Sequence, residues 1–357
     1  MILSAISVLG TTRILRTPIY IVAPVMIVLV SLAQILFRPA LWKRLSPRQL
    51  VEHVFPISGW TSTSSRVDVL MYLLNKLTRG VIFLSGNYLI LLMVSAESGL
   101  FGHFLPAHRL VEPTLASAIV VTLVMVLVWD LGDFLGHYAL HKIPLLWEIH
   151  KVHHSATFLS PVTGFRTHPL EIYARNIFPS IVASVALFGI CYWYRLDAVQ
   201  LLSAMWVFYG ITSLLILQQL QHSHLPIGLG PLDFLFISPR MHQLHHSVRE
   251  DHWDKNFATL FSIWDWTFGT AIRGAPATRV ETGLGNGAAA DSQYHSLYGV
   301  YLRPIANIAG LAGSMVFNRV PAQDRLRATT HANMESTAAS RQWGAHDGEG
   351  ETVAKSS

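Results

Sequence analysis

Histidine is the residue type whose number and spacing in this sequence point most directly to chemistry. The chain has 18 histidines in 357 residues, and imidazole is the commonest metal ligand in proteins. Three short segments hold eight of them: "HYALH" at 137–141, "HKVHH" at 150–154 and "HQLHH" at 242–246. Because residues three and four apart lie on one face of a helix, each segment is expected to present its imidazoles together.

The number of these imidazoles indicates more than one metal ion. A structural zinc site takes four ligands and a catalytic one takes three plus water, so eight histidines predict a dimetal site. The five histidines of 137–154 suffice for one ion at most, and residues 222–246 are expected to complete the second. Imidazole suits zinc, copper, iron and nickel alike, so the spacing leaves the metal open.

The composition is that of a membrane protein. Hydrophobic residues make up 51% of the chain and charged residues 13%, against roughly 25% charged residues in soluble domains. A spanning helix needs about 20 apolar residues, and five segments qualify: 19–37, 80–99, 114–136, 174–194 and 198–217. A weaker stretch, 299–317, contains Arg303 and Pro304 and is predicted to be interfacial. The fold class predicted is an all-α polytopic membrane protein, with about four to five transmembrane helices and a cytoplasmic helical cap that holds the histidines.

Basic residues orient these spans. The connection between the first two spans holds seven of them, whereas 100–113 holds only Arg109; the seven are Arg38, Lys43, Arg44, Arg48, Arg66, Lys76 and Arg79. By the positive-inside rule the first connection is cytoplasmic. The last two spans form a hairpin near Arg195 and Asp197, so residues 137–173 and 218–275 are predicted to lie on the same, cytoplasmic side.

Charge and cysteine usage exclude other classes of function. The net charge is +5, but the basic residues are scattered beside apolar runs, so no nucleic-acid partner is expected. A single cysteine, Cys191, excludes an intramolecular disulfide and a thiolate metal cluster. Four regions are predicted: an N-terminal membrane region at 1–113, a catalytic domain at 114–275, a loop with a candidate interfacial helix at 276–317, and a disordered tail at 318–357.

The three histidine segments, with "WEIHKVHHS" and "WDWTFGT" around them, resemble the fatty acid hydroxylase or sterol desaturase superfamily of integral-membrane di-iron oxidases. The resemblance covers roughly residues 114–272. It implies an O2-dependent attack on an unactivated C–H bond of a lipid by two iron ions, with zinc as a substitute in purified protein. The ligands it implies are His137, His141, His150, His153, His154, His222, His242, His245 and His246. His224 stands where the family usually has Asn, so a tenth ligand and a hydrogen-bonded supporting group both remain open for it.

The resemblance leaves the reaction open between lipid hydroxylation and desaturation, and a non-catalytic zinc-binding membrane protein is the alternative from another class. No catalytic residue is predicted beyond the metal ligands. Both oxidations need two external electrons, and the sequence has no flavin, haem or dinucleotide motif, so a separate electron-transfer protein is expected. Its predicted docking surface is basic: Lys142, Lys151, Arg166, Arg240 and Arg249. The membrane is predicted to be a bacterial inner membrane or the endoplasmic reticulum.

Supporting residues are also predicted around the histidines. Metal-bound histidines usually donate their other N–H to a carboxylate or carbonyl, and the candidates for this role are Asp133, Glu148, Asp233 and Asp265. His168, which precedes a proline, is predicted to have a structural role or to support a ligand, rather than to be a ligand itself. Trp264 and Trp266 are predicted to anchor the chain at the bilayer interface.

Overall fold

The computed structural model describes residues 25–31, 46–101, 103–105, 110–274 and 280–316, without the side chains of 77–87 and 314–316. The chain divides into two compact units, Met1–Ile305 and Ala306–Ser357, and the packing below concerns the first. Secondary structure in the described residues is helical, without a β-strand, which confirms the all-α prediction. The predicted disordered tail, 318–357, lies outside the described residues.

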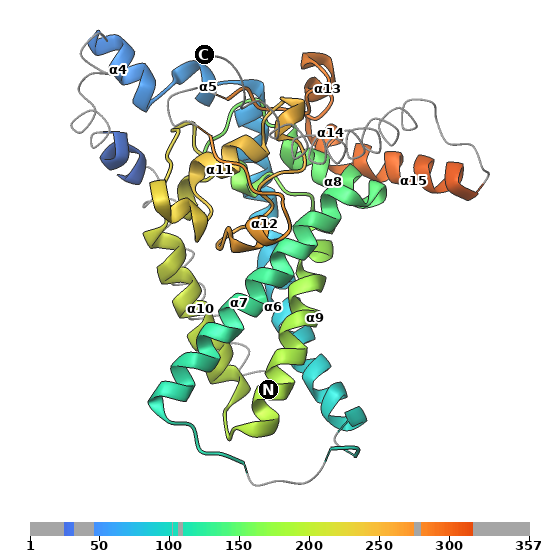
Figure 1. Cartoon of the computed structure of the whole chain (residues 1–357). Helices are drawn as coiled ribbons and strands as arrows, with labels where there is room; N and C mark the ends of the chain where they lie inside the picture. The colour runs from blue at the N-terminus through green and yellow to red at the C-terminus, as the bar shows by residue number, and fades with distance from the viewer. Residues whose placement is uncertain (1–24, 32–45, 102, 106–109, 275–279, 317–357) are drawn as a thin grey trace, which may run out of the picture. The chain divides into compact units, whose positions relative to one another are not determined.

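Three helices among the described residues are long and apolar enough to cross a membrane (Figure 1): α7 (Leu115–Lys142), α9 (Pro169–Trp193) and α10 (Ala198–Leu215). They correspond to the third, fourth and fifth predicted spans. Helices α9 and α10 form the predicted hairpin, because α9 ends at Trp193 and Asp197 caps α10 by accepting a hydrogen bond from the backbone N–H of Gln200.

The other two predicted spans are accounted for in part. Helix α6 runs over 39 residues, Thr63–Phe101, and contains the predicted span 80–99, with Tyr88–Phe101 as a shorter apolar helix. Residues 63–79, predicted as a connection, are instead the first part of α6. A helix that projects beyond the bilayer keeps its backbone hydrogen bonds internal, so basic residues there do not end it. Of the span 19–37, only residues 25–31 are described, and they are helical.

The spanning helices pack closely because small residues line their contact. A Cβ atom added to Gly132 of α7 would lie 2.3 Å from the Cα of Pro179 in α9, and one added to Gly136 would lie 2.9 Å from the carbonyl oxygen of Arg175. Glycines four residues apart let two membrane helices approach to backbone contact. Helix α7 therefore packs closely against α9 at the residues that directly precede His137.

The remaining elements are short. They are α4 (Pro47–Val54), α5 (Ile57–Trp60), α8 (Pro144–His154), η1 (Thr163–Phe165), η2 (Gln218–Leu220), η3 (Gly230–Phe234), α11 (Pro239–His245), η4 (Glu250–His252), α12 (Ile263–Thr267), α13 (Ala288–Ser292), α14 (Leu297–Tyr301) and α15 (Arg303–Val316). The predicted interfacial stretch is broken at Leu302, between α14 and α15. Helices α8, α11 and α12 lie at the end of the bundle where α7 and α10 finish and α9 starts (Figure 1). The two histidine-bearing regions thus share one end of the bundle, as the parity of the spans predicts.

Candidate metal centre

Prolines start the two short helices that carry most of the histidines. Pro144 occupies the first turn of α8, and Ile143 before it is extended, with φ −97° and ψ 114°, as the residue before a proline prefers. This break ends α7 after His141 and lets α8 begin a new direction. Pro239 begins α11 in the same way, behind a Ser238 cap that accepts from the N–H of Met241. The histidines follow in the last turns of α8 and α11.

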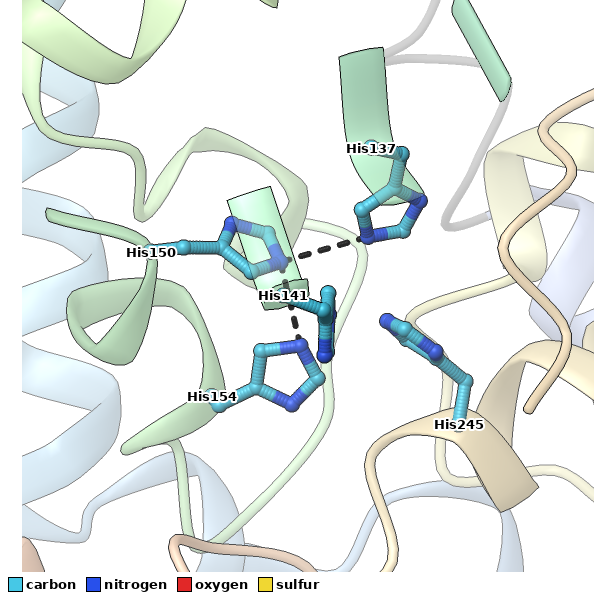
Figure 2. Close-up of side chains that lie close together, drawn as sticks. All are labelled: His137, His141, His150, His154 and His245. Carbon is cyan, nitrogen blue, oxygen red and sulfur yellow. Dashed lines mark hydrogen bonds between the residues drawn. The ribbon is translucent and has the colours of Figure 1, made fainter. Parts of the chain in front are cut away.

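All nine predicted histidines come together, in two groups. The first group is His137, His141, His150, His154 and His245, and the second is His153, His222, His242 and His246. Within each group, one ring nitrogen from every residue lies within 4.8 Å of the others. Figure 2 shows the imidazoles of the first group, which come from α7, α8 and α11, turned toward one another.

Contrary to our expectation, the histidines of 137–154 do not all belong to one group and those of 222–246 to the other. His153 of α8 belongs to the second group, and His245 of α11 belongs to the first. In each helix the pair four residues apart stays in one group, because those two side chains lie one above the other, while the residue between them points to the other group. The groups are neighbours, since the rings of His154 and His246 stack with centroids 4.6 Å apart.

The hydrogen bonds of the first group leave a place for a cation. The Nδ1–H of His137 donates to the carbonyl oxygen of Phe257 at 2.7 Å, and the Nδ1–H of His150 donates to Glu171 at 2.8 Å. A neutral imidazole has only one N–H, so the Nε2 atoms of both rings carry lone pairs. These two atoms lie 3.2 Å apart. With no proton between them, a bound metal ion is what would make this approach favourable.

The same close approach recurs in the second group. The Nε2 atoms lie 3.1 Å apart for His222 and His153, 2.9 Å for His242 and His222, and 3.2 Å for His246 and His242. Two nitrogens bound at about 2.1 Å to one ion, at a right angle, are separated by roughly 3 Å. The spacing of the donors therefore fits ligands that share an ion.

Burial keeps these imidazoles neutral. It lowers the pKa of His150, His154 and His246 well below 6.5, and that of His222 to about 3. Among the described residues, the buried Nε2 atoms of His141 and His245 also have no hydrogen-bond partner. Since a buried polar atom without a partner is unfavourable, the residues present fit a metal ion bound by neutral nitrogen.

One short loop, residues 254–257, orients three histidines of the first group. Asp254 Oδ1 lies 3.5 Å from Nδ1 of His141, the Lys255 carbonyl accepts from His245 at 2.7 Å, and the Phe257 carbonyl accepts from His137. The loop has two non-glycine residues in the left-handed region, Asp254 with φ 55° and Asn256 with φ 56°. This conformation is rare outside glycine. It lets the carbonyl oxygens of Lys255 and Phe257 accept from two different rings, those of His245 and His137.

Side chains beneath this loop hold its conformation. The buried Asn256 side chain donates to the carbonyl oxygens of Met241 and Ile272 and accepts from the N–H of Ile272. The Asp265 carboxylate accepts from the N–H groups of Phe257 and Ala258. The loop is thus tied to α11, which carries His242 and His245.

The carboxylates that directly contact histidines of the groups in the bonds described differ from the four candidates. Asp133 pairs with Arg175, Glu148 with Lys151, and Asp233 accepts from the N–H of Leu229. Of the four candidates, Asp265 supports a histidine indirectly. It accepts from the N–H of Phe257, and the carbonyl oxygen of Phe257 accepts from His137. The carboxylates in direct contact are Glu171 and Asp254, which no spacing in the sequence relates to His150 or His141.

His224 and His168 lie outside both groups. His224 lies with its Nε2 3.0 Å from the carbonyl oxygen of His53, and its ring stacks on Phe158 with centroids 5.7 Å apart. His224 is therefore a hydrogen-bonded residue outside both groups. His168 caps α9 by accepting from the N–H of Leu170, and its other ring nitrogen donates to the Tyr301 carbonyl. Its predicted structural role is confirmed.

The predicted basic docking surface is wrong in two of its residues. Arg166 and Arg240 are buried, with 0% and 3% of their surface exposed. Arg166 pairs with Asp68 at 2.8 Å and donates to the carbonyl oxygens of Val152 and Tyr294. Its buried side chain therefore connects three segments that are distant in the sequence. A basic residue in a loop need not face water when several carbonyl groups surround it.

Comparisons with known proteins agree with this geometry. Residues 122–270 match the family model of fatty acid hydroxylase. The human alkylglycerol monooxygenase is 30% identical over 150 residues, which cover 40% of this chain and 28% of that protein. The zebrafish (Danio rerio) protein of the same name is 28% identical over 144 residues, with the same coverage. The ornithine lipid hydroxylase OlsE of Rhizobium tropici is 27% identical over 141 residues, 40% of this chain and 38% of that protein.

The chain therefore spans between about a quarter and two fifths of the length of these curated relatives. No solved structure matches it at a significant level. The matched region contains both histidine groups and the loop that orients them. Residues 122–270 of the chain therefore form a fatty acid hydroxylase domain.

Proposed function

We propose that the chain is a membrane-bound di-iron monooxygenase that hydroxylates a C–H bond of a lipid. The observation that carries the proposal is the pair of lone-pair-bearing Nε2 atoms of His137 and His150, 3.2 Å apart, within two adjacent histidine groups. Five histidines in the first group exceed the four ligands of a structural zinc site. This excess supports iron, which accepts five or six ligands, over a structural zinc ion.

The relatives support hydroxylation over desaturation. Both kinds of relative carry names of oxygen-inserting enzymes, one for alkylglycerols and one for an ornithine lipid. Each name describes a lipid with a polar head. A polar-headed lipid is accordingly the substrate class that we propose, with the alkyl chain as the part that is oxidised.

The reaction balances with two external electrons. The lipid R–H, O2, two electrons and two protons give R–OH and water. Two iron ions bound by the histidine groups would supply the activation of O2. The chain's own part is to hold the imidazoles neutral and oriented, through Glu171 and the carbonyl groups of Lys255 and Phe257, and to exclude water by burial. The electrons would come from a separate one-electron carrier protein.

The position of the histidines suits a lipid substrate. Helix α7 carries His137 and His141 in its last turns, where the spanning helix leaves the bilayer. A lipid could present its chain there without full transfer into water. The excess of basic residues before the second span supports a cytoplasmic location of the site.

The test is a comparison of lipids from cells that express this chain, a His153→Ala variant, or a His224→Ala variant. His153 belongs to a histidine group and His224 does not, so the second variant controls for loss of an imidazole outside the groups. We expect a lipid that gains one oxygen atom with the wild type and with His224→Ala, and no such lipid with His153→Ala. A product that lacks two hydrogens would instead establish a desaturase. Oxidation that survives in His153→Ala would refute the assignment of the site.

A further inference from the structure

An exposed apolar surface lies on η3 and α12, outside the metal centre. We name it the aromatic shelf, and its side chains are Leu232, Phe234, Leu235, Trp266 and Phe268, from 38% to 54% exposed. The rings of Phe234 and Trp266 lie 5.0 Å apart, and Trp266 Nε1 donates to the carbonyl oxygen of Asp233. Two segments that are distant in sequence thus form one surface. Exposed apolar side chains on two adjoining segments indicate an interaction surface.

The depth of the shelf follows from its contacts with α7. Asp130 of α7 accepts hydrogen bonds from the N–H of Leu260, the N–H of Phe261 and the indole N–H of Trp264. The ring of Phe268 stacks on Phe134, with centroids 5.1 Å apart. The segment that carries the shelf therefore lies beside the stretch of α7 from Asp130 to Phe134.

This stretch of α7 falls near the edge of the hydrocarbon core. At about 1.5 Å per residue, Asp130 and Phe134 lie about 22 and 28 Å along the helix from Leu115. The hydrocarbon core of a bilayer is about 30 Å thick. With the apolar start of α7 at the far boundary, Phe134 and the Phe268 ring stacked on it reach the near boundary.

The non-helical backbone next to Asp130 has several of its N–H groups hydrogen-bonded to buried carboxylates, which suits a position at this depth in the membrane. Non-helical backbone is tolerated there only where its polar groups are satisfied inside the protein. Asp130 accepts from two N–H groups of the loop before α12, and Asp265 accepts from two more, those of Phe257 and Ala258. These hydrogen bonds explain why the spanning helix α7 has a buried carboxylate, Asp130. In the bonds described, Asp130 contacts no member of the histidine groups.

The rim of the shelf has the chemistry of a membrane boundary. The Arg273 guanidinium lies 4.8 Å over the Phe234 ring, and its side chain is 39% exposed. Aromatic rings with a cation beside them are typical of the layer between hydrocarbon and water. The last residues of α10, Leu214 and Leu215, are also exposed, at 46% and 75%, and belong to the surface that a spanning helix turns to lipid.

We propose that the aromatic shelf is embedded in the interfacial layer of the bilayer, on the histidine side, and that lipids cover it. The lipid-facing surface of the bundle then continues onto the cap. The inference depends on the membrane location of the chain and not on its metal or reaction, so it goes beyond the proposed function. A water-exposed shelf, or a shelf covered by another protein, is the alternative that the experiment must exclude.

The experiment uses the full chain in phospholipid nanodiscs, with Cys191→Ser as the background. Single cysteines replace Phe234, Leu232, Asp251 and Val185, one at a time, and receive a nitroxide spin label. Asp251 and Val185 are both 60% exposed, the first on η4 and the second in the middle of α9, so they serve as water and bilayer references. Collision rates with O2 and with a water-soluble nickel chelate are then measured.

We expect nickel collisions at positions 232 and 234 to fall to below about a third of those at 251, with oxygen collisions rising toward those at 185. Nickel collisions equal to those at 251 would overturn the proposal. Protection from both reagents would overturn it too, because it would mean that protein covers the shelf. Position 232 stands in for 234 if Phe234→Cys fails to fold.

A second measurement needs no label. Brominated phospholipids quench tryptophans that touch the acyl chains, so Trp266→Phe should reduce the quenched fraction of the fluorescence. Trp60→Phe is the matched control, since Trp60 contacts Phe158 in the cap. An equal quenched fraction in the wild type and in Trp266→Phe would contradict lipid contact at Trp266.

Discussion

The Nδ1 atom of His150 lies 2.8 Å from Oε1 of Glu171, and neither side chain is more than 1% exposed. Glu171 stands in the first turn of α9, so a spanning helix fixes the orientation of an imidazole on α8. The contact also fixes the tautomer, because the N–H that donates to Glu171 leaves Nε2 free to bind a metal ion.

Replacing Glu171 by Gln should weaken metal binding without removing a ligand. The amide is a poorer acceptor than a carboxylate, and loss of such a supporting partner typically costs about 10- to 100-fold in metal affinity or activity. Metal retained after dialysis against a graded chelator series measures the change. Glu112→Gln, at an exposed pair with Arg195, is the control and should retain metal like the wild type. Equal retention in both variants would contradict a role for Glu171.

Metal analysis separates the iron proposal from structural zinc. Chain purified without oxygen from iron-replete cells should contain about two irons per chain, since each histidine group offers enough nitrogen donors for one ion. Removal of the metal should lower the thermal unfolding midpoint, because bound ions stabilise only the folded state. His242→Ala should lose metal, whereas His168→Ala, outside the groups, should keep it. Zinc alone after iron-replete growth would count against iron.

The loop at 254–257 should depend on Asn256 both for its backbone and for its side chain. Asn256→Ala removes three hydrogen bonds and places alanine at φ 56°, which should cost at least about 2 kcal/mol of stability. Asn256→Gly permits this φ but still lacks the bonds, so it should fall between alanine and the wild type. Unfolding free energies and metal content of the three proteins test this order. If glycine is no better than alanine, the left-handed backbone contributes nothing.

The buried pair of Arg166 and Asp68 should hold the cap together. Asp68→Asn leaves the Arg166 charge without its counter-ion inside the protein, and breaking a buried pair in this way typically costs about 3–5 kcal/mol. Arg166→Met combined with Asp68→Leu removes both charges and should lower the stability less than Asp68→Asn does. Thermal unfolding midpoints give the comparison, with Arg249→Gln, at an exposed pair, as the control. If the double variant is as unstable as Asp68→Asn, the uncompensated charge of Arg166 is not the cause of the instability.

Acid should destabilise the metal-free protein. Burial lowers the pKa of His154 and His246 well below 6.5, whereas in the unfolded chain these groups take up protons near pH 6.5. Below that pH the unfolded state therefore binds more protons than the folded state, and the free energy of unfolding falls. We expect the thermal midpoint to be constant from pH 8 to about 7.5 and to decline from about 6.5 downward. A midpoint independent of pH in that lower range would mean that the histidines are solvated.

The local parts of the site follow from the sequence. Spacings of three and four residues put imidazoles on one face of a helix, and the lengths of the apolar runs locate α7, α9 and α10. Pro144 and Pro239 also mark the starts of the two short helices, a local signal that we did not use in our predictions. These features depend on residues that are neighbours along the chain, which is why they could be predicted.

The remaining features depend on how helices cross. Whether His153 joins one group or the other is decided by the packing of α8 against α11. Glu171 contacts His150 because α9 passes beside α8, and Arg166 is buried because the carbonyl groups of Ser64, Val152 and Tyr294, from three segments, converge on it. No spacing within one segment contains this information, so Glu171 and Asp254 could not be predicted as partners of His150 and His141.

The exchange of His153 and His245 between the groups bears on how the protein acquires its metal. Helices α8 and α11 each contribute to both groups, so the first ion to bind draws together the two helices that the second ion needs. The second ion then binds to a site already ordered by the first. Loading should therefore be cooperative, with chains that carry a single ion scarce at every stage of a metal titration.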